Sequence, residues 1–227
     1  MATYKRRDVI ASMLDSGIVG VFYHADAEMA LKTLQAAYDG GMRVFEWTNR
    51  GDRAHEVCSL LLQYADQHLP GMVVGVGSVM DAGTAALYLQ LGVNFVVSPI
   101  LNEETARVCN RRKVLWIPGC GSLTEISNAE SYGAEFVKIF PGSAVGGPGF
   151  VKAIKGPCPW TEIMPTGGVA PTEENLRAWI EAGVRVVGMG SKLFDKKAIE
   201  AQDFDSLRSK IKTAILRFHT IKKKAFQ

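Results

Sequence analysis

Short runs of apolar, often β-branched residues recur at regular intervals along the chain. Their centres lie about 20–28 residues apart, and each interval is long enough for one helix and two loops. The pattern predicts eight strands: Ile18–Tyr23, Arg43–Thr48, Met72–Gly75, Asn94–Ser98, Val114–Pro118, Phe136–Phe140, Glu162–Pro165 and Arg185–Met189.

Helical periodicity fills most of these intervals. In Ala25–Gly40, the apolar residues Met29, Leu31, Leu34 and Ala37 lie near one face of a helix. Several predicted helices stop before a glycine, which is a common residue just after a helix end. The other helices expected between strands are Arg53–Leu69, Asp81–Leu91, Glu103–Arg111, Ser122–Tyr132 and Thr172–Ala182.

Strands that alternate with helices indicate an α/β protein whose strands are parallel and joined by right-handed crossovers. An open, doubly wound sheet is the alternative architecture. Eight strand signals, with informative residues after many different strands, favour a closed (β/α)8 TIM barrel in a single domain. We expect an N-terminal helix at about 5–16, the barrel at about 17–194 and a C-terminal helix at about 203–220.

Composition and net charge indicate a globular domain and limit the kinds of binding partner that the sequence predicts. The chain has 227 residues, 47% of them hydrophobic, which suits one domain with a buried core. Lys and Arg exceed Asp and Glu by 26 − 23 = 3, an excess too small to predict a nucleic-acid partner. The excess lies mostly in Lys5-Arg6-Arg7 and Lys222-Lys223-Lys224, which we interpret as solvated chain ends.

The chain also carries few signs of a membrane or of export. No apolar run approaches the ~18 residues that span a bilayer, and no signal-peptide pattern follows the basic start. The four cysteines are scattered, without a CxxC pair or closely spaced histidines. We therefore expect a cytoplasmic protein with reduced thiols, no membrane partner and no metal site.

Lys138 is the first candidate for chemistry. It lies in a run that otherwise has the pattern of a buried strand, and Phe136, Lys138 and Phe140 share one face of that strand. Burial favours the uncharged amine, the form that attacks a carbonyl to make a Schiff base. The alternative is a lysine at a strand end whose stem is buried and whose ammonium reaches water.

Glu46 is a second charged residue in an apolar strand. Strand geometry puts Glu46, Thr48 and Arg50 on one side and Phe45 and Trp47 on the other, towards the helices. A carboxylate inside a barrel is costly unless it is paired. Arg50 could be its structural partner, or it could bind the carboxylate of a substrate.

Glycine-rich turns follow the last two predicted strands. Thr166-Gly167-Gly168 comes after the seventh strand, and Gly190-Ser191 comes after the eighth. In TIM barrels, these two loops often hold a phosphate on backbone N–H groups. Tight turns also need glycine, so each pair alone is a weak signal.

Three further features are less specific. The glycine-rich turn after the third strand presents the hydroxyl of Ser78. Of the histidines, His24 ends the first strand and could line a pocket. The long loop Phe140–Gly149 follows Lys138 and could cover the site or form a rigid turn.

Taken together, these segments resemble the 2-keto-3-deoxy-6-phosphogluconate (KDPG) / 4-hydroxy-2-oxoglutarate (KHG) aldolase family. The resemblance runs from about Gly17 to Phe194. Its most specific parts are a Glu-x-Thr-x-Arg in the second strand, a Lys-x-Phe-Pro in the sixth and a Pro-Thr-Gly-Gly in the seventh. The matching segments are Phe45–Arg50, Val74–Val79, Val97–Pro99, Ile117–Gly119, Phe136–Pro141 and Met164–Val169.

The resemblance implies a class I aldolase on a TIM barrel, usually a homotrimer, with no cofactor beyond the covalent lysine imine. Lys138 would form the Schiff base with a 2-keto-3-deoxy acid substrate, and Glu46 would move protons. Arg50 would bind the pyruvate-derived carboxylate, with Ser78 and Pro99 lining that end of the pocket. The phosphate of the aldehyde half would lie near Thr166 on the two glycine loops, formed by Gly167, Gly168, Gly190 and Ser191.

Some positions depart from the family pattern. Ser78 stands where many members carry Thr, Tyr23-His24 stand where many carry an Arg, and Trp47 and Asn49 are unusual. These differences leave the preferred substrate open between 2-keto-3-deoxy-6-phosphogluconate, the corresponding phosphogalactonate and 4-hydroxy-2-oxoglutarate. They also keep two alternatives open: a phosphate-binding sugar isomerase or epimerase on the same barrel, and a non-catalytic ligand-binding relative.

Overall fold

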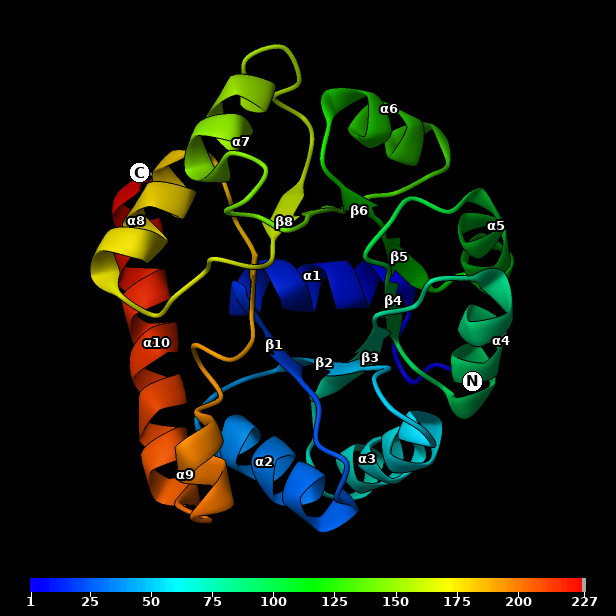
Figure 1. Ribbon diagram of the computed structural model, residues 1–227, viewed down its shortest axis with the longest axis vertical. Helices are drawn as coiled ribbons and strands as arrows, with labels where there is room; N and C mark the ends of the chain where they lie inside the picture. Colours follow the sequence, from blue (N-terminus) through cyan, green and yellow to red (C-terminus); the bar gives the residue numbers. More distant parts are fainter. Residues whose placement is uncertain (226–227) are drawn as a thin grey trace.

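The computed structural model describes residues 1–225 and places the strands centrally, with helices around them (Figure 1). Each of the eight predicted runs overlaps a strand, and a ninth strand of two residues follows the fifth run. The strands are β1 Ile18–Phe22, β2 Val44–Thr48, β3 Val73–Gly77, β4 Phe95–Val97, β5 Leu115–Ile117, β6 Gly119–Cys120, β7 Val137–Ile139, β8 Ile163–Pro165 and β9 Val187–Met189.

Helices follow the strands as the periodicity predicts, and two more are present. The sequence pattern misses α7 because it starts with Gly147-Pro148-Gly149, residues typical of a loop, and it misses α9 because that helix has only five residues. The helices are α1 Arg6–Ser16, α2 Ala27–Asp39, α3 Ala54–His68, α4 Ala82–Leu91, α5 Glu103–Arg112, α6 Leu123–Ser131, α7 Gly147–Lys155, α8 Glu173–Glu181, α9 Lys196–Glu200 and α10 Phe204–Ala225.

The strands form two parallel sheets rather than the single ring of eight that the sequence predicts. One sheet has the order β5-β4-β3-β2-β1-β9, and the other has the order β6-β7-β8. Pro118 separates β5 from β6, because proline has no N–H to continue the ladder. On the other side, a single bridge joins Thr166 to Gly188. The α/β class, the parallel strands and the single domain are confirmed.

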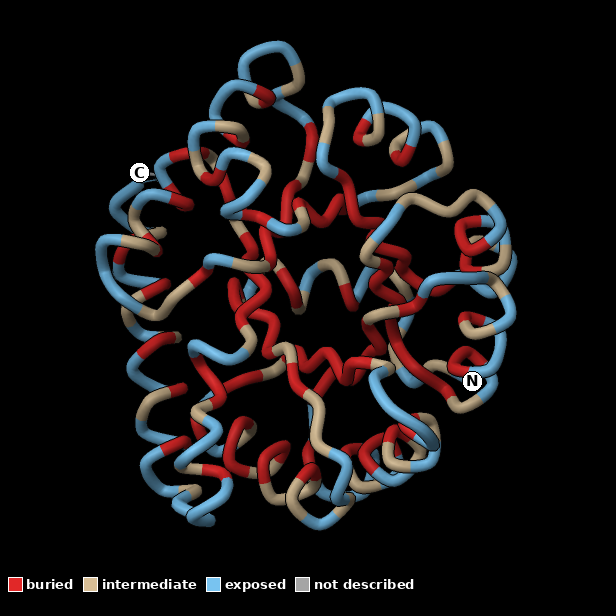
Figure 2. The backbone as a smooth tube through the Cα atoms, in the orientation of Figure 1, coloured by how far each residue is buried: buried red, intermediate tan, exposed pale blue. Residues whose placement is uncertain are grey.

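The apolar residues in and beside the strands pack into two different clusters. Val44 and Phe136 pack in a cluster with Val9 and Met13 of α1, whereas Phe45 packs in the larger cluster that includes the outer helices. Figure 2 shows the buried residues following the strands. Helix α1 lies behind the strands in Figure 1, across the ends at which they begin. The carboxyl ends of the strands therefore face the viewer.

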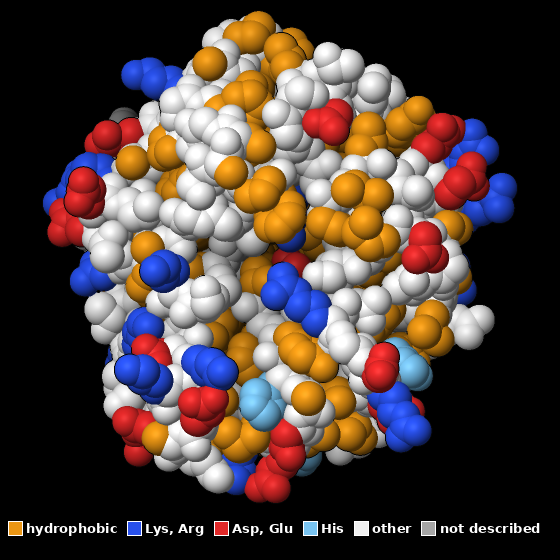
Figure 3. Space-filling view, viewed as in Figure 1, with side chains coloured by type: hydrophobic (Ala, Val, Ile, Leu, Met, Phe, Trp, Pro, Cys, Tyr) orange, Lys and Arg blue, Asp and Glu red, His pale blue; other side chains and the backbone are white. Residues whose placement is uncertain are grey.

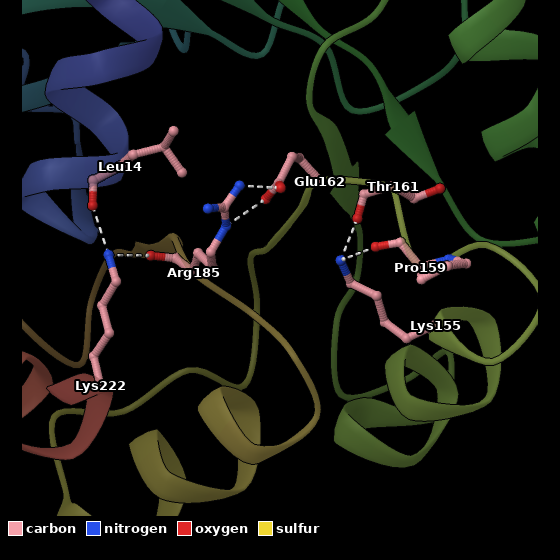
Figure 4. Close-up of polar contacts among 7 residues, drawn as sticks. All are labelled: Leu14, Lys155, Pro159, Thr161, Glu162, Arg185 and Lys222. Carbon is pink, nitrogen blue, oxygen red and sulfur yellow. Dashed lines mark hydrogen bonds and ion pairs between the residues drawn. The ribbon is translucent and has the colours of Figure 1, made fainter. Parts of the chain in front are cut away.

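Polar contacts join the chain ends to the start of the last strands (Figure 4). Lys222 of α10 donates from Nζ to the carbonyl oxygens of Leu14, at 2.6 Å, and Arg185, at 3.5 Å. Arg185 forms a two-bond ion pair with Glu162. The expectation that Lys222 is solvated is therefore wrong, because its ammonium group donates a hydrogen bond to the Leu14 carbonyl oxygen near the end of α1.

The N-terminal basic run is also more than a solvated end. Arg6 of that run donates from Nη2 to Asn110 Oδ1 and to the Val114 carbonyl oxygen, both at 2.8 Å.

Within residues 1–225, no helix combines the length and apolar character needed to cross a membrane.

Candidate active site

Lys138 and Glu46 lie side by side inside the molecule. Lys138 is the central residue of β7 and Glu46 is the central residue of β2. Lys138 Nζ lies 3.8 Å from Glu46 Oε1, and the side chains are 6% and 1% exposed. Nζ of Lys138 therefore does not reach bulk water, and the basic side chain within 4.0 Å of the Glu46 carboxyl group is Lys138 rather than Arg50.

The carboxyl group of Glu46 is in an unusual environment. Neither of its oxygens has a hydrogen-bond partner within the described chain. Burial raises the pKa of Glu46, and the positive charges of Lys138 and Arg50 oppose that shift. A carboxyl group with a raised pKa keeps its proton to a higher pH than a free glutamate does, and it can give that proton up during a reaction.

A glycine of the neighbouring strand makes room for this carboxyl group. A Cβ placed on Gly77 of β3 would lie 1.8 Å from Glu46 Oε1. The next residue, Ser78, has φ 60°, a left-handed conformation that is uncommon outside glycine. The end of β3 is therefore shaped closely around Glu46.

A cavity of about 500 Å³ opens at the carboxyl ends of the strands. Thr48, two residues after Glu46, lines it, and so does Phe140, whose ring centre lies 4.9 Å from Lys138 Nζ. The buried pair thus adjoins the cavity wall. Of the predicted site residues, the cavity lining includes Arg50, Thr166, Gly167, Gly168, Gly190 and Ser191.

The loop after β8 combines an unpaired hydroxyl with two left-handed glycines. Thr166 Oγ1 is buried without a hydrogen-bond partner in residues 1–225, and Gly167 and Gly168 have φ 89° and 80°. The carbonyl oxygens of Thr166 and Gly167 accept from the N–H groups of Gly142, at 2.8 Å, and Ser143, at 3.0 Å. The start of the loop after β7 is therefore fixed against the loop after β8.

Arg50 stands at the exposed edge of this cavity. Its backbone N–H donates to the Thr48 carbonyl oxygen at 2.9 Å, and the residue is exposed. Among residues 1–225, its guanidinium takes part in no ion pair within 4.0 Å. Figure 3 shows basic side chains bordering the central hollow of this face.

Besides Lys138 and Glu46, two other predicted site residues lie outside the cavity lining. Ser78 follows β3 directly, and Pro99 follows β4, with its carbonyl oxygen 2.2 Å from where a Cβ on Gly119 would lie. Gly119 is the register partner of Lys138. Pro99 therefore lies against β6, the strand paired with the strand of Lys138.

The cavity also contains residues that the sequence pattern does not single out. Lys192 and Lys196 line it together with Glu200. The only signal for them is that Lys192 directly follows the predicted Gly190-Ser191 turn. His24 lines the cavity as anticipated, and Tyr23 lies beside it.

No cluster of three or more His, Cys, Asp or Glu side chains in residues 1–225 is arranged to hold a metal ion. Each of the four cysteines is free, and Cys58, Cys109 and Cys120 are buried. Burial raises the pKa of the Cys109 and Cys120 thiols to about 12, so these thiols stay protonated and unreactive at neutral pH.

Comparison with known proteins gives a consistent match over most of the chain. The family model described as KDPG and KHG aldolase matches residues 9–210. A 2-dehydro-3-deoxy-phosphogluconate aldolase of Pseudoalteromonas atlantica is 32% identical over 199 residues, covering 87% of this chain and 89% of the relative. The KHG/KDPG aldolase of Escherichia coli K12 is 30% identical over 206 residues, covering 90% and 93%.

The fold matches a solved aldolase as well. The crystal structure of a KDPG aldolase from Legionella pneumophila holds pyruvate as a covalent carbinolamine intermediate. It superposes with a TM-score of 0.81 at 28% identity, covering 90% of this chain and 96% of that one. With a buried lysine–glutamate pair beside a cavity and a family match over most of its length, the chain belongs to the KDPG and KHG aldolase family.

Proposed function

We propose that the protein is a class I aldolase that cleaves 2-keto-3-deoxy acids to pyruvate and an aldehyde. The observation that carries this proposal is the buried pair, in which an amine lies 3.8 Å from a carboxyl oxygen. An amine held out of water is the nucleophile that Schiff-base catalysis needs, and the adjacent carboxyl group supplies proton transfer. The covalent pyruvate carbinolamine of the Legionella relative fits the same chemistry.

In the proposed reaction, the amine of Lys138 adds to the C2 carbonyl and forms a carbinolamine. Protonated Glu46 gives its proton to the carbinolamine hydroxyl, so that water leaves and a protonated imine remains. The Glu46 carboxylate, through a water molecule, then takes the C4 hydroxyl proton as the C3–C4 bond breaks. The electron pair of that bond moves to the imine, leaving an enamine and a free aldehyde.

The second half of the cycle releases pyruvate. Glu46 returns its proton to C3 of the enamine, which restores the imine. Water then adds to the imine carbon and gives a proton to Glu46, and the carbinolamine collapses to pyruvate and the free amine. Glu46 and Lys138 thus end in the protonation states in which they began.

We further propose how the two ends of the substrate are held. Arg50 binds the carboxylate of the pyruvate half, at the end of the site where Ser78 and Pro99 lie. The backbone at Gly167, Gly168, Gly190 and Ser191 takes a phosphate on the aldehyde half. Thr166 supplies the unpaired hydroxyl between them, and Lys192 adds positive charge to the same wall. The favoured substrate is therefore the phosphorylated acid, KDPG.

Trapping with pyruvate and borohydride tests the reaction type. We expect a reduced pyruvyl adduct at Lys138, located by peptide mass spectrometry, and none in Lys138→Met. Lys152→Met, which removes an exposed lysine of α7, should be labelled like the wild type. If the wild type gives no adduct under conditions that label a known class I aldolase, the aldolase proposal fails. An isomerase that uses Glu46 as a base would behave in that way.

Three broader features of the molecule belong to the same proposal. The Thr166–Gly188 bridge on one side, and the run Leu115–Cys120 shared by β5 and β6 on the other, support a closed (β/α)8 barrel over about residues 17–194. The family resemblance supports a homotrimer, and the free thiols support a cytoplasmic location.

A further inference from the structure

Arg50 sits in a short turn between β2 and α3 that lacks a cap of its own. Gly51 and Arg53 of this turn have left-handed φ values of 77° and 58°. Arg53 is the residue before α3, and its side chain makes no capping hydrogen bond to the helix. The conformation of the turn must therefore be held by residues from other elements.

One of these residues is Tyr88 of α4. Its side chain is fully buried, and its hydroxyl donates to Asn49 Oδ1 at 2.8 Å. The backbone N–H of Asn49 donates to the Gly77 carbonyl oxygen, also at 2.8 Å. Both the side chain and the backbone of the residue before Arg50 are thus fixed from the side of β3 and α4.

Tyr23 and Trp47 hold the opposite side of the turn. A Cβ on Gly51 would lie 2.4 Å from the Tyr23 hydroxyl oxygen, so Tyr23 packs directly on that glycine. The ring centres of Tyr23 and Trp47 are 5.2 Å apart. Trp47 Nε1 donates to the carbonyl oxygen of Ala54, the first residue of α3, at 3.0 Å.

We propose that Tyr88 is a positioning residue for Arg50: its hydrogen bond to Asn49 fixes the turn from which the guanidinium reaches an anionic carboxylate. This inference rests on the proposed function of Arg50 as the group that binds the pyruvate carboxylate. An arginine on a fixed backbone loses less freedom when it binds than one on a mobile turn. Tyr88 therefore affects the binding of pyruvate more than the chemistry at Lys138.

Tyr88→Phe tests the inference, because it removes only the hydroxyl and leaves Asn49 Oδ1 without its donor. We measure the pyruvate concentration that gives half-maximal borohydride trapping at Lys138, and KM and kcat for KDPG cleavage. The half-saturating pyruvate concentration and KM should rise about fivefold to tenfold. The maximal extent of trapping and kcat should stay within about twofold of the wild type.

Tyr64→Phe is a matched control. Tyr64 on α3 donates to Gln35 Oε1 on α2, also at 2.8 Å, and neither residue lines the active-site cavity. Its loss should leave both the half-saturating pyruvate concentration and KM unchanged. In an Asn49→Ala background, Tyr88→Phe should have no further effect, because the acceptor is already absent.

The outcomes test the aldolase proposal and the positioning role of Tyr88 separately. If wild-type protein forms no adduct with pyruvate, the aldolase proposal fails. If the wild type is labelled but Tyr88→Phe has the wild-type pyruvate dependence, the positioning role of Tyr88 is wrong. The positioning role is equally wrong if Tyr88→Phe lowers kcat as much as it raises KM, or if it weakens pyruvate binding as strongly in the Asn49→Ala background.

Discussion

At the scale of single residues, the molecule keeps a carboxyl group where a carboxyl group is costly. Glu46 is fully buried, and its two oxygens lack hydrogen bonds in the described chain. One amine at 3.8 Å cannot replace the water that the carboxylate has lost. An apolar residue of similar volume would fit the strand better, so function accounts for Glu46 better than stability does.

This cost should appear as a pH dependence of stability. Burial raises the pKa of Glu46 above its ordinary value of 4.5, so the folded protein keeps this proton at pH values where the unfolded chain has lost it. The free energy of unfolding should therefore fall as pH rises from about 4.5 to the raised pKa, by about 1.4 kcal/mol for each pH unit between the two pKa values.

Urea unfolding across this pH range checks the prediction with two variants. Glu46→Gln has no proton to lose, so it should lack this part of the decline in unfolding free energy. Glu174→Gln, which changes an exposed carboxyl group of α8, should keep the wild-type pH dependence. Identical slopes for the wild type and Glu46→Gln would show that Glu46 titrates alike in the folded and unfolded states.

The sequence predicts the residues that break a pattern better than the residues that support them. Lys138 and Glu46 stand out because each is a charge in an apolar strand. Tyr88 does not stand out, because an aromatic residue in a helix is ordinary, and its partner Asn49 lies 39 positions away. Only the folded structure, which places Tyr88 of α4 beside the residue after β2, brings this donor and acceptor together.

At the scale of secondary-structure elements, the strands and most helices follow from periodicity, and their ends follow from particular residues. Helix α4 begins after Asp81, whose side chain accepts from the Thr84 N–H, and ends at Gly92 with φ 102°. Periodicity does not predict β6, which comes directly after Pro118, because a strand of two residues has no pattern of its own and its pairing with β7 is set by the fold.

Strand β3 makes room for the buried carboxyl group of the neighbouring strand, β2. Gly77→Ala should place a methyl group against Glu46, where a Cβ would lie 1.8 Å from Oε1. We expect a loss of about 1–3 kcal/mol in the free energy of unfolding. We also expect a lower cleavage rate at saturating KDPG, because the methyl group pushes the carboxyl group away from Lys138.

Gly149→Ala is the control for a glycine change of the same size. Gly149 lies in α7, and a Cβ there meets nothing within 4 Å. That variant should be as stable as the wild type, or more stable by about 0.5–1 kcal/mol, because alanine favours the helix. Urea midpoints and cleavage rates of both variants test the prediction, and a Gly77→Ala protein with wild-type values would contradict the close packing of β3 on Glu46.

At the scale of the whole molecule, the two ends of the strands have separate tasks. Helix α1 and the polar contacts of Figure 4 cover the ends at which the strands begin. The cavity lies at the opposite ends, next to the buried pair in the middle of β2 and β7. The alternation of strands and helices predicts this parallel arrangement, but the sequence does not show that Lys222 crosses from α10 to α1, because a basic run near a chain end is usually solvated.

Lys222 therefore provides a test of how the chain ends stabilise the fold without touching the site. Its ammonium donates to the carbonyl oxygen of Leu14 at 2.6 Å, one of the last carbonyls of α1, which otherwise lacks a partner in that helix. Lys222→Met keeps most of the side-chain stem and should lower the free energy of unfolding by about 1–2 kcal/mol. Lys223→Met, which changes an exposed neighbour, should have no effect on the urea midpoint.

Because the site lies at the other end of the strands, both variants should keep the wild-type extent of pyruvate trapping per folded molecule. Equal urea midpoints for the two variants would mean that the contact between α10 and α1 adds no stability, and reduced trapping in Lys222→Met would mean that the two ends of the molecule are coupled.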